Sequence, residues 1–133
     1  MRVVIIGCGR VGSHLAKRLD KDGHTVIVID RNQQAFQRLS EDFRGERAVG
    51  NGLVEEFVRP FLEQPTDLLF VMTDKDNVNL MIAQWVKRRF QVGRVITVVH
   101  DAVLSGLYGE LGLETVCPTD LVIQELLVLM QEK

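Results

Sequence analysis

Three glycines with fixed spacing stand near the amino end of the chain, within the run Gly7–Gly12. The β-branched run Arg2–Ile6 precedes them and an amphipathic stretch follows, and in this context the spacing Gly-x-Gly-x-x-Gly is typical of a phosphate-binding loop. Gly7 would permit a tight turn, Gly9 would let a phosphate approach the backbone, and Gly12 would let a helix lie close to a sheet. The loop is therefore expected to bind the phosphates of a nucleotide.

Arg10 lies inside this loop, next to Val11. Its guanidinium could neutralise phosphate charge through paired hydrogen bonds, or it could simply point into solvent. We favour the phosphate contact, because the loop geometry places this position near the ligand.

A carboxylate ends the second β-branched run, Thr25–Asp30. Asp30 can accept hydrogen bonds from both hydroxyls of an adenosine ribose, and it would repel a 2′-phosphate. NAD(H), ATP, ADP or AMP are thus expected in preference to NADP(H). Arg31 weakens this preference, because arginine is the usual partner of a 2′-phosphate. The alternative role for Asp30 is to cap the helix that follows.

Short β-branched runs alternate with stretches of helical periodicity along the whole chain, which is typical of βαβ units. The sequence predicts an α/β fold: a Rossmann-like three-layer α/β/α domain whose six-stranded parallel sheet, covered on both faces, has the order 3-2-1-4-5-6. The expected strands are Arg2–Ile6, Thr25–Asp30, Ala48–Val49, Asp67–Met72, Arg94–Val99 and Thr115–Cys117. The expected helices are Val11–Lys21, Gln33–Asp42, Leu53–Leu62, Asn77–Phe90, Val103–Leu111 and Leu121–Met130. Helix ends are expected before Gly23, Gly93 and Gly112, and Thr119 is expected to cap the last helix.

The composition is that of one folded globular domain over 1–133, with 46% hydrophobic and 26% charged residues. A net charge of -2 argues against nucleic acid as a partner. Two cysteines give no disulfide framework and indicate a reducing cytoplasm. No segment resembles a signal peptide or is long and apolar enough for direct membrane insertion.

Two further runs, Val49–Gly52 and Val71–Asn79, make the pattern more specific than a general dinucleotide fold. Together with the glycine loop and Asp30, they resemble the RCK N-terminal domain, also called TrkA-N or KTN, of Trk/Ktr-type potassium-uptake regulatory proteins. The similarity runs from Met1 to Thr119. It implies a domain that binds NAD(H), ATP, ADP or a relative, forms dimers, and reports nucleotide state to a potassium channel or transporter.

The resemblance also implies roles for single residues. Asn51 falls near the adenine edge, and Thr73, Asp76 and Asn79 match a pattern at the cleft; the alternative is that Thr73, Asp74 and Asp76 cap the following helix. The family often has Asn-Asp-Pro where this chain has His100-Asp101-Ala102, and the family's companion C-terminal RCK domain is not expected within residues 1–133. The complete set of expected binding residues is Gly7, Gly9, Arg10, Val11, Gly12, Asp30, Arg31, Asn51, Gly52, Thr73, Asp76 and Asn79.

No catalytic residues and no metal-ligand spacing are recognisable, so the leading hypothesis is a non-catalytic regulatory module. The alternative is a small NAD-dependent oxidoreductase or its cofactor-binding subunit, and a third is an interaction domain that has lost its ligand. Cys8, near a helix start, is either a redox-sensitive thiolate or a small packed residue. The last two expected helices are predicted to pack against a second subunit, giving a homodimer or a higher homo-oligomer. The expected location is the cytoplasm, peripheral to the inner face of the membrane through a transporter.

Overall fold

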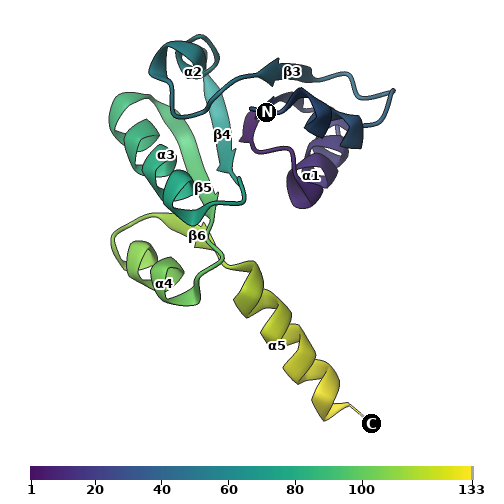
Figure 1. Cartoon of the computed structure of the whole chain (residues 1–133), viewed down its shortest axis with the longest axis vertical. Helices are drawn as coiled ribbons and strands as arrows, with labels where there is room; N and C mark the ends of the chain where they lie inside the picture. Colours follow the sequence, from purple (N-terminus) through teal and green to yellow (C-terminus); the bar gives the residue numbers. More distant parts are fainter. Residues whose placement is uncertain (133) are drawn as a thin grey trace.

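Strand β1 (Arg2–Ile6) lies at the centre of a six-stranded parallel sheet in the computed structural model, which describes residues 1–132 (Figure 1). The strand order is β3-β2-β1-β4-β5-β6, as the sequence predicts. The other strands are β2 (Thr25–Asp30), β3 (Glu46–Val49), β4 (Thr66–Val71), β5 (Val92–Val98) and β6 (Glu114–Val116). The helices are α1 (Arg10–Lys21), the 3-10 helix η1 (Gln33–Arg38), α2 (Glu55–Leu62), α3 (Asp76–Arg89), α4 (Ala102–Glu110) and α5 (Pro118–Gln131).

The central strands are β-branched and almost fully buried, because neighbouring strands hydrogen-bond to both edges of β1. Val3 is in register with Val26 of β2 and with Leu68 of β4. All pairings are parallel, so the carboxyl ends of the strands meet at one edge of the sheet. The order reverses between β1 and β4, and a fold of this kind has its crevice there.

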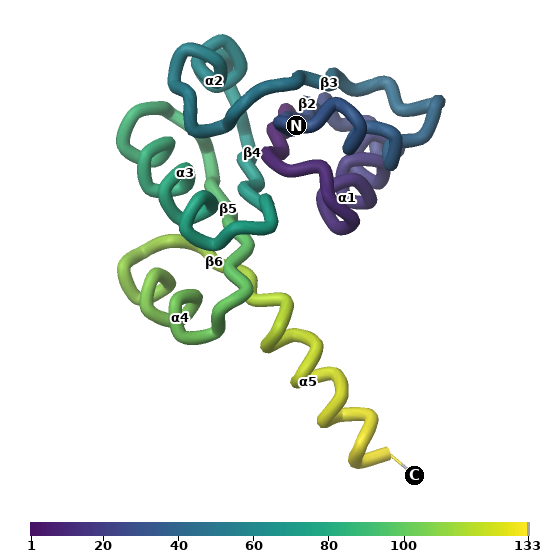
Figure 2. Tube along the Cα trace, in the orientation of Figure 1, coloured from purple at the N-terminus to yellow at the C-terminus, as the bar shows by residue number. Residues whose placement is uncertain are grey.

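Three helices cover one face of the sheet. Val58 and Leu62 of α2, together with Ile82 and Val86 of α3, pack on the inward side chains of β1, β2 and β4. Leu104 of α4 joins the same cluster. On the other face, α1 and η1 cover β1 and β2, and Figure 2 shows α1 on the opposite side of the sheet from α2, α3 and α4.

Helices lie on both faces of the sheet, as the sequence predicts, but on the second face they cover only part of it. Side chains alternate along a strand, so Leu68 and Phe70 of β4 and Ile96 and Val98 of β5 point to the face that carries α1. These four side chains are only partly buried. No helix of residues 1–132 packs over β5 and β6 on this side (Figure 1).

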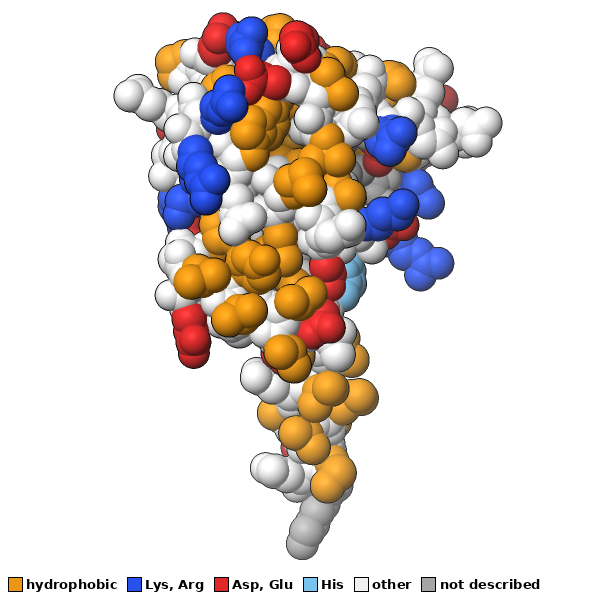
Figure 3. All heavy atoms as spheres, turned by 60° about the vertical axis from the view of Figure 1, so that its left-hand side comes forward, with side chains coloured by type: hydrophobic (Ala, Val, Ile, Leu, Met, Phe, Trp, Pro, Cys, Tyr) orange, Lys and Arg blue, Asp and Glu red, His pale blue; other side chains and the backbone are white. Residues whose placement is uncertain are grey.

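Helix α5 leaves the body of the molecule after β6 and projects away from it (Figure 1). None of its residues is buried, although eight of its side chains are large and apolar. Figure 3 shows apolar side chains gathered along this arm and on the lower part of the body, where α4 exposes Val103 and Leu107 and its C-cap residue Leu111 is also exposed.

Several local predictions are confirmed and others are wrong. Gly23 and Gly112 have φ of 90° and 95° just after α1 and α4, where a left-handed residue ends a helix. Gly93 lies inside β5, since α3 already ends at Arg89. Thr119 does not cap α5: the helix starts at Pro118, a residue favoured at the first helical position, and Thr119 donates its hydroxyl to the His100 carbonyl.

The predicted helix over 33–42 is also wrong as an α-helix. The chain forms a 3-10 helix over Gln33–Arg38, and the later bond from Phe43 N to Ser40 O closes a separate turn. Ala35, Phe36, Leu39 and Phe43 are nevertheless buried on the sheet. Their spacing imitates helical periodicity, because successive turns can bring the same positions to the core.

Candidate functional site

The glycine loop lies between the end of β1 and the start of α1, and close backbone contacts fix its shape. Gly7 has a φ of 115°, and a Cβ there would lie 2.5 Å from the Met72 carbonyl oxygen. A Cβ on Gly12 would overlap the carbonyl oxygen of Gly7. Both positions therefore require glycine for reasons inside the protein.

Gly9 differs, because a Cβ there would meet no atom within 4 Å. Gly9 is the N-cap residue of α1, and its carbonyl accepts the first helical bond, from Ser13 N. The N–H groups of Arg10, Val11 and Gly12 thus have no acceptor within the helix, and no side chain caps them. Free N–H groups and the positive end of the helix dipole favour an anion at this place.

Asp30 is bonded directly to this loop. Its Oδ2 accepts from Cys8 N at 2.8 Å and its Oδ1 accepts from Asn32 N at 2.8 Å. The helix-capping alternative is wrong for Asp30, because Asn32 caps η1 through the bond from Gln34 N to its Oδ1. The carboxylate therefore orients the glycine loop and keeps lone pairs for a further donor. Arg31 beside it is exposed.

Cys8 is a packed residue in this structure. Its side chain is fully buried and its Sγ donates to the Ala35 carbonyl at 3.5 Å. Burial and the neighbouring Asp30 carboxylate raise the pKa of the Cys8 thiol, although nearby cations oppose the shift. A raised pKa disfavours the thiolate, so the structure supports the packing role over the redox role.

The β4–α3 connection is held by Asn79, which is fully buried. Its Oδ1 accepts from Thr73 N at 2.9 Å and from Thr73 Oγ1 at 2.6 Å. Its Nδ2 donates to the carbonyls of Thr73 at 3.0 Å and Val98 at 2.9 Å. Asn79 thus positions Thr73 beside Gly7 and ties α3 to the end of β5.

Replacing Asn79 with alanine is expected to lower the free energy of unfolding by about 3 kcal/mol, because partly buried groups of Thr73 and Val98 lose four hydrogen bonds. Urea unfolding followed by circular dichroism measures this change. Asn77→Ala, at an exposed position in the same helix, is the control and should cost under about 0.5 kcal/mol. Equal costs for the two variants would contradict the role of Asn79.

Asp76 bonds to the β5–α4 connection and does not cap a helix. Its Oδ1 accepts from His100 N at 2.7 Å and contacts the ring Nδ1 of His100 at 3.0 Å, and its Oδ2 accepts from Asp101 N at 2.9 Å. Partial burial would raise the pKa of Asp76, but these hydrogen bonds outweigh it, and the pKa lies below its ordinary value.

The turn after β3 contributes Asn51 and Gly52. Asn51 Oδ1 accepts from Leu53 N at 2.9 Å, which leaves its amide nitrogen to face other groups. Gly52 is buried, and a Cβ there would lie 2.9 Å from the side chain of Ile6. Gly52 therefore serves the packing of the turn against β1.

The structure brings the expected residues together in two groups. The glycine loop is hydrogen-bonded to Asp30, and Thr73 is hydrogen-bonded to Asn79. The two groups meet where Gly7 contacts the β4–α3 connection. Val11 and Arg10 are exposed at the mouth of the loop. Sequence reasoning missed two residues. Arg38 reaches the Cys8 carbonyl at 3.4 Å, and no local pattern marks it. His100 follows the carboxyl end of a strand, and this position alone could have indicated it as a candidate site residue.

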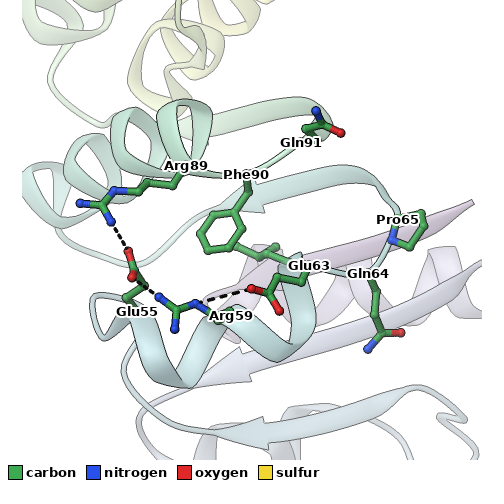
Figure 4. A pocket seen from close by; sticks show the side chains of 9 residues that line it. Glu55, Arg59, Glu63, Gln64, Pro65, Arg89, Phe90 and Gln91 are labelled. Atoms are coloured by element: carbon green, nitrogen blue, oxygen red, sulfur yellow. Dashed lines mark hydrogen bonds and ion pairs between the residues drawn. The ribbon is translucent and has the colours of Figure 1, made fainter.

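A pocket lies at the opposite edge of the sheet, where the strands begin. It has a volume of about 540 Å³ and lies at the amino ends of β4 and β5, where Glu55 bridges Arg59 and Arg89 (Figure 4). It is separate from the glycine loop.

Among residues 1–132, no three His, Cys, Asp or Glu side chains gather as a metal site would require. None of the helices described is both long and apolar enough to cross a bilayer.

The strand order, the glycine loop after β1 and the acidic end of β2 define a Rossmann-like domain. The TrkA-N domain family matches residues 3–119, so the chain belongs to this family. The resemblance seen in the sequence is confirmed.

Curated relatives agree with this membership, and solved structures agree with the fold. The Trk system potassium uptake protein TrkA of Streptomyces coelicolor is 37% identical over 116 residues, which are 87% of this chain and 52% of that protein. The chain therefore spans about half the length of this relative. The Kef CTD of Shewanella denitrificans in its AMP-bound form has a TM-score of 0.79 at 19% identity, covering 100% of this chain and 84% of that one. The GsuK channel bound to NAD has a TM-score of 0.73 at 19% identity, covering 88% and 21%.

Proposed function

We propose that this chain is a non-catalytic regulatory module that binds an adenine nucleotide at its glycine loop and controls a potassium channel or transporter. One observation carries the proposal: the open amino end of α1 and the carboxylate of Asp30 form one hydrogen-bonded unit through Cys8 N. An anion can bind the free N–H groups while a ribose hydroxyl donates to the carboxylate.

The chemistry of the site supports NAD(H), ATP, ADP or AMP as ligands. These molecules share adenosine and phosphate, which are the parts that Asp30 and the loop would contact. Arg10 is exposed at the loop and would pair with a phosphate, and Thr73 and Asn51 would line the cleft. The negative charge of Asp30 would disfavour the 2′-phosphate of NADP(H). The solved relatives with AMP and with NAD support this ligand class.

Replacing Asp30 with alanine is expected to weaken the binding of NAD+, ADP and AMP by about 10- to 100-fold, because hydrogen bonds to a charged acceptor are lost. Isothermal titration calorimetry with each nucleotide measures the change, and NADP+ should bind the unaltered protein more weakly than NAD+.

The control is Asp74→Ala, which removes the same charge from an exposed position at the same edge of the sheet. Its affinities should equal those of the unaltered protein. The proposal fails if the unaltered protein binds none of these nucleotides, or if both aspartate variants weaken binding equally.

We infer that the partner is a membrane potassium-transport subunit, since the relatives over most of this chain are named as Trk system potassium uptake proteins. Such a partner would place the chain in the cytoplasm at the inner face of the membrane. Regulation of this kind requires that nucleotide binding shift the domain between arrangements that the partner distinguishes.

We also infer that two copies of the chain associate through α5 and α4. A helix with eight large apolar side chains normally has a buried face, yet α5 exposes Leu126, Leu127 and Leu129 by half or more. The uncovered part of the sheet beside it offers Phe70 and Ile96. An arm from a second copy would cover this surface, and two-fold symmetry would repeat the contact.

A further inference from the structure

His100 stands at the carboxyl end of the sheet, in the half that the glycine loop and Asp30 do not occupy. The loop and Asp30 follow β1 and β2, whereas His100 follows β5, which lies beyond β4 from them. A dinucleotide lies across both halves of such a sheet, with its second nucleoside over the later strands. A mononucleotide needs only the first half.

The backbone of His100 is fixed by side chains from two helices. Its N–H donates to Asp76 of α3 at 2.7 Å, and its carbonyl accepts from Thr119 of α5 at 3.0 Å and from Cys117 Sγ at 3.5 Å. The connection is therefore rigid without any help from the imidazole ring.

The ring is nevertheless held in one orientation while 48% of the side chain stays exposed. Hydrogen bonds hold the pKa of Asp76 below its ordinary value, so this carboxylate is ionised and can only accept. Nδ1 of His100, 3.0 Å from Asp76 Oδ1, must therefore be the donor. This bond fixes the tautomer of the neutral ring, with Nε2 left as an acceptor. Within residues 1–132, Nε2 has no hydrogen-bond partner.

We propose that His100 is a specificity residue for a dinucleotide, accepting a hydrogen bond at Nε2 from a hydroxyl of the second ribose. The proposal rests on the nucleotide site described above and deepens it, because it selects the dinucleotide among the adenine nucleotides. Asp76 is then a positioning residue, which orients the ring without touching the ligand. The contacts of Gly7 with Met72 and Thr73, together with the first turn of α3, connect the glycine loop to His100.

The test compares NAD+ with ADP, which shares only the adenosine half and its phosphates. Calorimetry on the unaltered protein should give tighter binding of NAD+ than of ADP. His100→Ala should weaken NAD+ by about tenfold and leave ADP unchanged, because one hydrogen bond to the second ribose is lost.

Two conservative variants separate ligand contact from structural support. His100→Asn keeps an amide at the position of Nδ1 and can still bond to Asp76, but it does not reach the ligand, so it should behave as His100→Ala. His100→Gln places an amide oxygen near the position of Nε2 and should recover part of the NAD+ affinity. His24→Ala, at the amino edge of the sheet, is the control and should change neither affinity.

Equal binding of NAD+ and ADP by the unaltered protein would overturn the inference and leave the nucleotide site intact. So would a loss in His100→Ala that is the same for both ligands, or no loss at all. Absence of binding by the unaltered protein to either ligand would instead overturn the proposed function itself.

Discussion

Replacing Gly12 with alanine is expected to destabilise the protein by about 2 kcal/mol and to abolish nucleotide binding. Alanine normally stabilises a helix by about 1 kcal/mol relative to glycine. Here the new Cβ would overlap the Gly7 carbonyl oxygen, a backbone atom that cannot rotate away. Overpacking of this kind costs about 3 kcal/mol, so the overlap outweighs the helix propensity. Thermal unfolding and calorimetry with ADP measure the two effects.

Gly9→Ala is the matched variant in the same loop. Its Cβ would meet nothing within 4 Å and its φ of -82° suits any residue, so the free energy of unfolding should fall by less than about 1 kcal/mol. Binding of ADP should nevertheless weaken at least about tenfold, because the methyl group occupies the space where a phosphate would approach the backbone. If Gly9→Ala binds ADP normally, Gly9 has no role with the phosphate. If Gly12→Ala is as stable as the unaltered protein, the close contact with Gly7 is unimportant.

Introducing a charge on α5 is expected to convert a dimer into a monomer. Leu126 is 59% exposed on the projecting arm and would be buried against a second copy. Leu126→Glu would place an unpaired carboxylate in that interface at a cost of several kcal/mol, which raises the dissociation constant at least about a hundredfold. Sedimentation velocity should show the unaltered protein at twice the 15.1 kDa mass of the chain and the variant at that mass.

Gln124→Glu is the control, since it adds the same charge to the same helix at a residue that is already polar. It should remain dimeric. A monomeric unaltered protein at micromolar concentrations would contradict the dimer, and a dimeric Leu126→Glu variant would place the interface elsewhere.

Much of the fold could be predicted because the signals are local. The strands Arg2–Ile6 and Thr25–Asp30 are continuous β-branched runs, and both have the predicted bounds. Gly23 and Gly112 end helices through a backbone conformation that glycine adopts readily. Such preferences depend on neighbours in the chain and can be read without the tertiary structure.

The contacts around α3 could not be predicted in the same way. Asp76 bonds to His100 across 24 residues, and Asn79 bonds to Val98 across 19. An aspartate in the first turn of a helix looks the same whether it favours the helix dipole or binds a neighbouring loop. Asp76 lies in the first turn and also binds the loop, and only the packing of α3 against β5 reveals the second role. The binding roles of the expected site residues stay predictions.

The coverage of the sheet was also beyond local reasoning. The apolar runs of β4 and β5 indicate strands buried on both faces, yet Phe70 and Ile96 are only partly buried in the single chain. A sequence records how apolar a surface is, and it does not record which molecule covers that surface. The same reasoning applies to α5, whose apolar side chains have no partner within residues 1–132.

The central place of β1 also affects how the chain is made. Val3 pairs with Val26 on one side and with Leu68 on the other, and 42 residues separate these two partners. At ribosomal rates of about 5–20 residues per second, roughly 2–8 s pass between their synthesis. During that interval one edge of an apolar strand has no neighbour, and such an edge can pair with a wrong strand. During synthesis, β1 is therefore exposed to aggregation through its free edge until β4 has been made.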